Sequence, residues 1–385
     1  MFFILGLGTL LPWNFFMTAS LYFQRRLNTT EWSNGTKVVR KEYYFNNWMT
    51  LLSQLPLLLF TLLNSFLYPR ISEAIRIAGS LVFILLLFIL TAVLVKVPME
   101  EDRFFSVTMA TIWFINSFGA VLQGSLFGLV GMLPQKYSSI FMSGQGLAGT
   151  FAAIAMLIAI GSKMDPETAA LGYFVTPCMG TLLTLFSYLV LPRLVSQLSS
   201  QHNCITHNPS DLTYTNSPIW VMAFCVMFVF TVTLSVFPAI TVDVKTTSEG
   251  KNWELYFISV CCFLIFNIND WLGRTITTKI RWPSKESRLF PVLVISRVVF
   301  IPLLMFCNVQ SRNYLPVLFE HDVAFSIIMV LFSLSSGYFV CLSMSYAPQL
   351  VEPKDAETAG ALMTFFLALG LSIGAALSFP LRKLI

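Results

Sequence analysis

Long uncharged runs recur along almost the whole chain, and they limit its fold more than any other feature. Residues 77–95 and 104–135, for example, contain no Asp, Glu, Lys or Arg. A helix needs about 20 apolar residues to cross a bilayer, so each run is long enough to span one. Only 11% of the residues are charged, against about 25% in soluble domains. The sequence therefore predicts an all-α polytopic membrane protein and argues against a large soluble core.

The runs predict eleven transmembrane helices in two groups. We expect them at residues 1–23, 46–68, 76–96, 105–131, 137–162, 169–192, 218–241, 254–279, 289–309, 323–347 and 358–381. The break after the sixth run predicts an N-terminal six-helix half (1–192), a short cytoplasmic loop (193–217) and a C-terminal five-helix half (218–385). Such a 6+5 division is typical of transporters whose two halves surround a central site.

An acid and a base lie inside the eighth predicted span. Asp270 and Arg274 are the only charged residues between Glu254 and Lys279. Their spacing of four puts them on one helix face, which Asn267 shares. A charge at bilayer depth costs about 2.5–3.5 kcal/mol on insertion scales and is normally kept for function. A mutually neutralised pair offers hydrogen bonds to a polar, uncharged ligand, although a purely structural salt bridge is the alternative.

Side-chain amides are the other polar groups expected at bilayer depth. Gln123 can pair with the edge of a nucleobase, since an amide carries two donors and an acceptor. Gln54 fits a helix–helix hydrogen bond equally well. Gly124 and Gly128 form a GxxxG pair, which favours close helix packing. Pro12 can open the first helix beside Trp13, or can simply kink it.

Three further charges have less specific interpretations. Arg297 lies near a predicted span end, where it can snorkel to the interface, and we expect a structural role. Arg76 and Glu357 lie at helix ends that the predicted topology places in the cytoplasm. They fit either an inner gate between the two halves or two solvated surface charges.

Two N-glycosylation sequons favour one orientation. Asn28 and Asn34 each begin an Asn-X-Thr sequon in the first loop, which indicates an extracytoplasmic position. The basic cluster at 279–288 would then lie inside, as the positive-inside rule expects. The total Lys and Arg count over all loops does not follow the rule, so charge bias alone leaves the topology open.

Cysteine and histidine give no sign of a metal site or an enzyme. The seven Cys lack metal-binding spacing, and the three His are scattered. We therefore interpret the Cys as small packing residues and expect no cofactor and no metal. The net charge of +5 is spread over loops, which argues against nucleic-acid binding.

Several segments together carry a family resemblance that runs along essentially the whole chain. They are GLGTLLPWNFFMTA, INSFGAVLQGSLFG, MSGQGLAG, FNINDWLGR and ETAGALMTFFLALGLSIGA. The chain resembles the equilibrative nucleoside transporters, most closely their type 2 vertebrate branch. The resemblance implies an eleven-helix, major-facilitator-like fold in the plasma membrane, with a cytoplasmic N-terminus and an extracellular C-terminus. It also implies facilitated diffusion by alternating access of nucleosides such as adenosine, uridine and inosine, some nucleobase transport, and binding of adenosine-reuptake-type inhibitors.

The resemblance also implies roles for individual residues. Gln123 would meet the nucleobase, and Arg274, held by Asp270, would face the ribose. The positions that match pocket-lining or inhibitor-sensitive positions are Trp13, Met17, Leu10, Leu57, Gln54, Gly119, Phe237, Phe263, Asn267 and Leu371. Those that match gate positions are Arg76, Glu357 and Asn14.

The chain departs from the family pattern in four places. It lacks the usual N-terminal tail, its central loop at 193–217 is short, SSGY stands at 335–338, and Pro380 lies in the last span. Two alternatives to facilitated diffusion remain. Proton-coupled transport would use Asp270 as the carrier, although the Arg274 charge disfavours its protonation. A receptor or membrane-embedded enzyme is the other class.

Overall fold

The computed structural model describes most of the chain. The described residues are 1–27, 30–33, 36–39, 45–67, 70–162, 165–202, 219–248, 251–310, 312 and 314–385. The predicted glycosylation sites, Asn28 and Asn34, lie outside them.

The N-terminal half is a bundle of helices with one small hairpin. Its elements are α1 (Phe2–Thr18), α2 (Ser20–Leu27), β1 (Thr30–Ser33), β2 (Thr36–Val39), α3 (Phe45–Leu67), α4 (Glu73–Lys96), α5 (Glu101–Gly131), α6 (Gln135–Gly161) and α7 (Pro166–His202). The antiparallel β1–β2 pair matches Thr30 with Val39 and Ser33 with Thr36. The Asn-Gly sequence between the strands is a strong hairpin signal, but the prediction from sequence includes it only as part of a glycosylation sequon.

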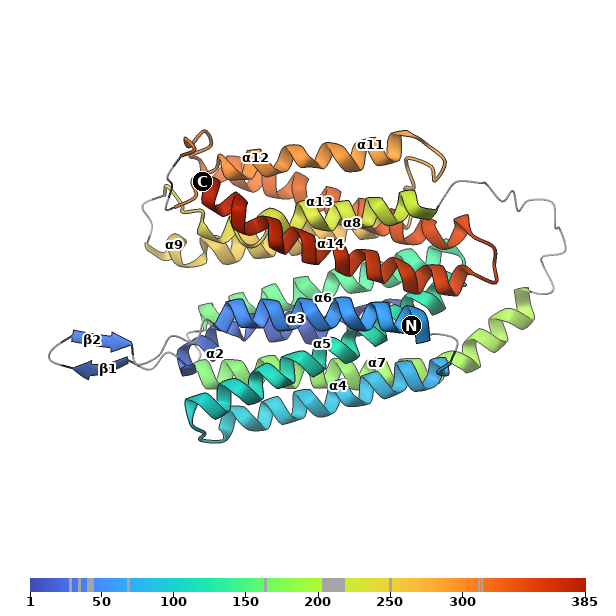
Figure 1. Cartoon of the computed structure of the whole chain (residues 1–385), viewed down its shortest axis with the longest axis horizontal. Helices are drawn as coiled ribbons and strands as arrows, with labels where there is room; N and C mark the ends of the chain where they lie inside the picture. The colour runs from blue at the N-terminus through green and yellow to red at the C-terminus, as the bar shows by residue number, and fades with distance from the viewer. Residues whose placement is uncertain are drawn as a thin grey trace.

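The C-terminal half is also helical and is more interrupted. It contains α8 (Ile219–Val236), a 3₁₀ turn (Thr241–Asp243), α9 (Lys251–Phe257), a π-helical segment η3 (Ile258–Leu264), α10 (Ile265–Ile276), α11 (Leu289–Ser296), η4 (Arg297–Val299), α12 (Phe300–Met305), α13 (Asp322–Tyr346), η5 (Ala347–Leu350) and α14 (Ala356–Leu384). The two halves lie side by side (Figure 1), and the hairpin and the C-terminus are at the end opposite the N-terminus. We call these the hairpin end and the N-terminal end.

The predicted spans agree with the helices in position. Eight described helices are long and apolar enough to cross a membrane, and three shorter apolar helices, Phe2–Thr18, Leu51–Phe66 and Leu289–Met305, fall in the remaining predicted spans. The total of eleven crossings stays a prediction. The sixth predicted span, 169–192, agrees with the apolar part of α7 (Glu167–Leu191), although the helix itself continues to His202. The division into halves at 192 stays a prediction. Hydropathy marks where a helix leaves the apolar layer, and a polar helix can continue beyond it.

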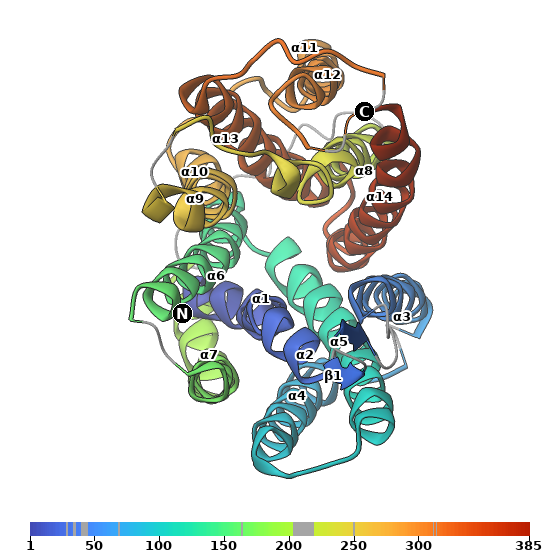
Figure 2. The same ribbon diagram turned by 90° about the vertical axis from the view of Figure 1, so that its left-hand side faces the viewer.

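Glycines bring helices into backbone contact inside each half. A Cβ on Gly144 would collide with the Phe3 carbonyl of α1, and one on Gly337 would collide with the Asp270 carbonyl of α10. Only glycine allows this approach, so α1 lies against α6 and α10 against α13, as the end-on view shows (Figure 2). Pro12 lies inside α1, which continues as a helix through it, so the predicted opening of the helix there is wrong.

Arg297 does not snorkel to the interface, which corrects the prediction made from its position. Its side chain is buried, with 1% of the residue exposed. The guanidinium donates to the Ser335 and Thr233 hydroxyls at 3.1 and 3.2 Å and to the Val229 and Phe332 carbonyls at 3.1 and 3.2 Å. Partners from α8 and α13 satisfy the charge internally, so Arg297 joins three elements of the C-terminal half.

We expect Arg297→Met to destabilise the protein. Methionine keeps most of the apolar stem but leaves the buried Thr233 hydroxyl and the partly buried Ser335 hydroxyl without the guanidinium donors. The lost charge-assisted bonds, partly offset by removal of a buried charge, suggest a loss of about 2–3 kcal/mol. The apparent melting temperature in detergent should fall by roughly 5 °C. Arg103→Met, at an exposed position, is the control, and equal melting of both variants would contradict this role.

Candidate functional site

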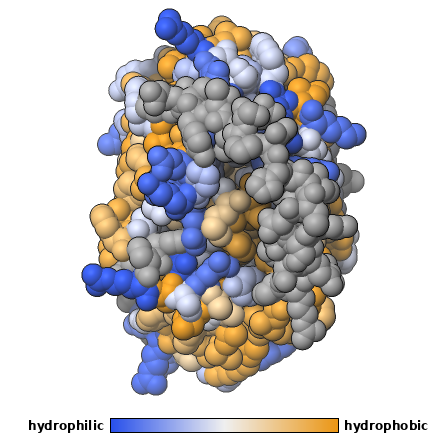
Figure 3. All heavy atoms as spheres, turned by 90° about the vertical axis from the view of Figure 1, so that its right-hand side faces the viewer, coloured by the Kyte–Doolittle hydropathy of each residue, from blue (hydrophilic) through white to orange (hydrophobic). Residues whose placement is uncertain are grey.

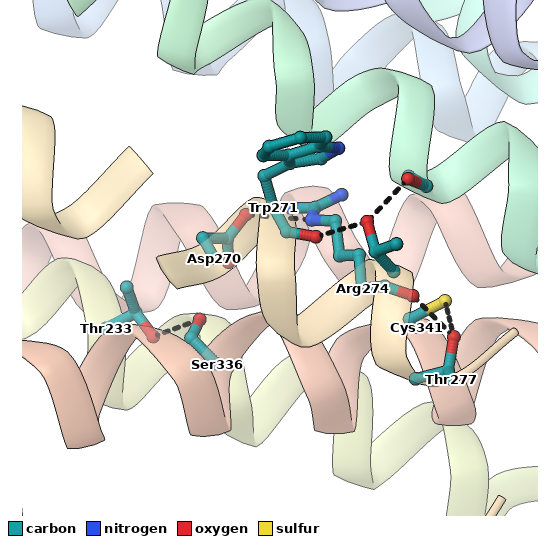
Figure 4. Close-up of polar contacts among 9 residues, drawn as sticks. Thr233, Asp270, Trp271, Arg274, Thr277, Ser336 and Cys341 are labelled. Atoms are coloured by element: carbon teal, nitrogen blue, oxygen red, sulfur yellow. Dashed lines mark hydrogen bonds and ion pairs between the residues drawn. The ribbon is translucent and has the colours of Figure 1, made fainter. Parts of the chain in front are cut away.

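The predicted charge pair forms on α10 of the C-terminal half. The Arg274 Nε donates to the Asp270 Oδ2 at 2.8 Å, and the two side chains are 9% and 11% exposed. Both belong to α10, and their spacing of one turn makes the contact local (Figure 4). A buried pair with this geometry keeps its charges neutralised while leaving other guanidinium N–H groups available to a ligand.

The pair lies where the two halves meet. A Cβ on Gly146 of α6 would lie 3.0 Å from the Arg274 Cδ and 2.9 Å from the Trp271 Cα. One turn further on, the Ser143 and Thr275 hydroxyls share a hydrogen bond of 2.7 Å between α6 and α10. The indole Nε1 of Trp271 is buried and has no hydrogen-bond partner among the described residues. Trp271 and Arg274 of α10 therefore lie against α6 of the N-terminal half.

Two amides meet beside this pair at a single glycine. The Asn267 Oδ1 occupies the space that a Cβ on Gly149 would need, and the Asn14 Oδ1 would lie 3.5 Å from that Cβ. The amide nitrogens donate to their own helices, to the Phe263 carbonyl for Asn267 and to the Leu10 carbonyl for Asn14, both at 2.8 Å. The carbonyl oxygens of both amides therefore face a junction of α1, α6 and α10.

Two predicted ligand-binding amides, Gln54 and Gln123, lie on α3 and α5. Gln123 is buried, with 8% of the residue exposed. The Gln54 Oε1 is buried and has no hydrogen-bond partner in the described part of the chain, so this oxygen does not make the helix–helix bond considered for Gln54. Gly119, one turn from Gln123 on α5, faces open space. An unpaired buried amide costs free energy, which a bound polar ligand would recover.

Aromatic rings gather near the pair in the C-terminal half. Phe237 lies T-shaped to Phe263, with ring centroids 5.9 Å apart and an interplanar angle of 70°. Phe266, which was not predicted, stacks on Phe237 at 3.9 Å and 9°. Its spacing of three from Phe263 puts both on neighbouring positions of one helix face, a signal that could have identified it.

The remaining predicted lining residues are less closely tied to these groups. Trp13 stacks on Phe16 at 6.2 Å and packs against a large hydrophobic cluster that contains residues of both halves, as does Leu371 from α14. Leu10 packs on a smaller cluster around Phe15, and Leu57 is half-buried. Met17 is 37% exposed. No hydrogen bond or ring contact between described residues joins this group to Gln123 or to the charge pair.

The predicted gate pair does meet across the two halves. The Arg76 Nη2 and the Glu357 Oε1 lie 3.8 Å apart, and the Arg76 Nη1 also donates to the Ser125 hydroxyl at 3.4 Å. Arg76 starts α4 and Glu357 starts α14, both at the N-terminal end. The pair therefore fits a gate better than two solvated charges, since the Arg76 side chain is only 5% exposed.

Further contacts between the halves gather at this end. A Cβ on Gly360 would collide with the Phe127 carbonyl, and one on Gly131 would lie 2.8 Å from the Ala356 carbonyl. A Cβ on Gly124 would meet the Asn64 amide nitrogen of α3, in the same half, at 2.6 Å and the Thr364 hydroxyl of α14, in the other half, at 3.3 Å. The packing interpretation of Gly124 is thus confirmed. These contacts close α5 against α14 between the gate pair and the level of Gln123.

Two open grooves lie elsewhere, at the hairpin end of the C-terminal half. The first, of about 590 Å³, is lined by Thr247, Ser248 and residues 321–324 with Ile327, and the second, of about 470 Å³, lies between Trp253 and the outer face of α13. Neither is lined by a predicted site residue.

Comparison with known proteins identifies relatives along the whole chain. Residues 109–207 and 197–383 match the family model described as Nucleoside transporter. The chain is 51% identical to human (Homo sapiens) Equilibrative nucleoside transporter 2 and 46% identical to human Equilibrative nucleoside transporter 1, each over 439 aligned residues that cover 100% of this chain and 96% of the relative.

Solved structures of low sequence identity share the fold. The proton:xylose symporter XylE has a TM-score of 0.59 at 13% identity, covering 99% of this chain and 86% of that one. The E. coli fucose:proton symporter FucP has a TM-score of 0.55 at 13% identity, with coverage of 99% and 90%. Both likenesses concern the fold alone, and they confirm the predicted major-facilitator-like arrangement.

Proposed function

The chain belongs to the equilibrative nucleoside transporter family, and from that premise we propose that it carries purine and pyrimidine nucleosides across the plasma membrane by facilitated diffusion. Its relatives are named transporters and its fold is a transporter fold, so it is not an enzyme. The higher identity to the human type 2 protein than to type 1 places it with the type 2 branch.

The observation that carries this proposal is the buried, mutually neutralised Asp270–Arg274 pair, with the buried amide of Gln123 as the second polar group at bilayer depth. A nucleoside is uncharged but presents several hydroxyls and a planar base with a polar edge. The Asp270–Arg274 pair supplies charge-assisted hydrogen bonds without a net charge, which suits ribose hydroxyls. Gln123 is buried and its amide carries two donors and an acceptor, which suits the edge of a base. Phe237 and Phe263 would border an apolar slot for the base.

The distribution of contacts supports alternating access. The halves touch through Arg76, Glu357 and Gly360 at the N-terminal end, while Gly119 on α5 faces open space further toward the hairpin end. Such an arrangement corresponds to a site closed on the N-terminal side. We propose that this side is cytoplasmic and that rocking of the two halves opens it in turn. The sequons at Asn28 and Asn34 would then lie outside the cell and carry glycans.

Proton-coupled transport is the second candidate mechanism, and the geometry ranks it lower. Asp270 accepts a 2.8 Å hydrogen bond from Arg274 and is already engaged in an ion pair, which a proton-carrying role would have to break in each cycle. A proton carrier must release and bind its proton during each cycle. Counterflow of labelled uridine, adenosine and hypoxanthine in proteoliposomes, at pH 5.5 and 7.5, tests both mechanisms. Exchange that is similar at the two pH values supports facilitated diffusion, whereas a several-fold rise at acidic pH would favour proton coupling.

We expect Gln123→Ala to lower uptake of both adenosine and uridine about tenfold, mainly through a higher KM. Loss of one neutral hydrogen bond to the base costs about 1–1.5 kcal/mol. Asn269→Ala is the matched control, because its amide donates to its own helix at the Ile265 carbonyl, and it should change uptake less than twofold. Unchanged KM in Gln123→Ala, at equal protein in the membrane, would remove Gln123 from the site.

A further inference from the structure

The segment between α10 and α11 concentrates positive charge at the N-terminal end. Residues 279–288, which we call the basic loop, contain Lys279, Arg281, Lys285 and Arg288 against one acid, Glu286. Lys279, Arg281 and Arg288 are exposed, and Lys285 is partly exposed. Among the described residues, none of these four cations belongs to an ion pair. The end-on view of this face shows hydrophilic side chains projecting around an apolar body (Figure 3).

Two tyrosines of α13 hold the backbone of the basic loop in a fixed shape. The Tyr338 hydroxyl donates to the Trp282 carbonyl at 2.6 Å and accepts from the Trp282 N–H at 3.1 Å. The Tyr346 hydroxyl donates to the Pro283 carbonyl at 3.0 Å. These hydrogen bonds fix the backbone of the loop on α13. Because the cations extend from an already ordered backbone, the entropy cost of binding an anion is lower.

The loop also displays apolar side chains among its charges. Ile280 and Trp282 are 57% and 60% exposed. Tryptophan beside basic residues at the end of a membrane helix is typical of the headgroup layer of a bilayer. The adjacent end of α6 adds an exposed Lys136, and the Arg281 Nη1 donates to the neighbouring Gln135 Oε1 at 3.3 Å. The cationic surface thus extends over both halves of the protein.

Two acidic residues at the N-terminal end already form ion pairs with cations outside the basic loop. Glu352 pairs with Lys354 at 2.8 Å, and Glu357 pairs with Arg76 at 3.8 Å. They do not neutralise the basic loop. An anion of the surroundings is then the natural counter-charge, and for a loop that also exposes Ile280 and Trp282 the nearest anions are lipid headgroups.

We propose that the basic loop, with Lys136, is a docking site for the headgroup of an anionic phospholipid. The phosphate and any second anionic group lie among the guanidinium and ammonium groups, while Trp282 and Ile280 enter the adjoining headgroup layer. The site is independent of the transport assignment. Only the leaflet that supplies the lipid rests on the orientation proposed above, in which the N-terminal end faces the cytoplasm.

Lipid retention by the full-length chain tests the site. The protein is released from micelles that contain equal amounts of phosphatidylglycerol and phosphatidylcholine, and bound lipids are counted by native mass spectrometry. The unaltered chain should retain phosphatidylglycerol in clear excess. Each basic residue near a membrane surface contributes about a fivefold factor. The variant K279Q/R281Q/K285Q/R288Q should therefore lose at least tenfold of its preference for phosphatidylglycerol.

A matched variant separates this site from general charge. K96Q/R103Q/K245Q/K383Q removes four exposed cations from the hairpin end, and its preference for phosphatidylglycerol should stay within about twofold. Melting in phosphatidylcholine alone shows whether each variant is folded. Equal losses in the two quadruple variants, or no loss in the first, would overturn the proposal. Displacement of phosphatidylglycerol by 10 mM inorganic phosphate would reassign the site to a soluble anion and overturn the membrane role as well.

Discussion

Arg274→Ala is expected to reduce uridine and adenosine uptake at least tenfold while the protein still reaches the membrane. The substitution removes the guanidinium that would bind ribose and leaves the Asp270 carboxylate buried without its 2.8 Å partner. An uncompensated buried charge costs about 3–5 kcal/mol, so the surroundings of Asp270 would rearrange or draw in water. Either change alters the site before any substrate binds. Initial uptake rates, divided by the amount of protein at the cell surface, give the comparison.

Asp270→Asn and the double variant D270N/R274Q show whether the two residues act as a pair. If they do, the effects of the single substitutions will not add, because removal of either partner already breaks the same ion pair. The double variant, which leaves no buried charge, should be folded and should still transport poorly. Arg103→Ala, at an exposed pair on the hairpin side of α5, is the control. Normal uptake in Arg274→Ala would exclude the pair from substrate recognition.

The contacts that could be predicted from the sequence are the local ones. Asp270 and Arg274 share a helix, so their spacing alone determines that they can meet. The Phe263–Phe266 spacing carried the same kind of information and would have completed the aromatic group. Helix positions could also be predicted, because uncharged length reports directly on the membrane. The polar C-terminal end of α7, which continues to His202, could not be predicted in this way, since a helix in water does not need an uncharged sequence.

The contacts that could not be predicted join distant segments. Arg297 looked like an interfacial residue because its acceptors, on α8 and α13, are 35 to 68 residues away in sequence. The meeting of Asn14 and Asn267 at Gly149 depends on three helices from both halves. The spacing of residues within one helix does not show which faces of different helices pack against each other. The predicted topology placed Arg76 and Glu357 on the same side of the membrane and left open whether they meet; in the structure they lie 3.8 Å apart.

The closure at the N-terminal end leads to the second prediction of large effect, which concerns Gly360. A Cβ at this position would collide with the carbonyl group of Phe127, with its carbon 2.9 Å away, and would lie 3.2 Å from the Gly128 Cα. All three are backbone atoms, which cannot rotate away as a side chain would. We therefore expect Gly360→Ala to separate α14 from α5 and to disfavour the closed state. Because a full cycle passes through that state, the maximal rate of uptake should fall at least fivefold, with a smaller change in KM.

The position of the two halves provides a readout that a loss of folding would not mimic. Spin labels at Met132 and Lys354, exposed residues on opposite halves of this end, should give a longer distance in Gly360→Ala than in the unaltered chain. Gly172→Ala is the matched control, since a Cβ there meets no atom within 4 Å, and it should change neither the distance nor the rate. An unchanged distance distribution in Gly360→Ala would mean that the halves do not need this close approach. The gate would then rest on Arg76 and Glu357 alone, whose 3.8 Å contact is long for an ion pair that must hold two domains together.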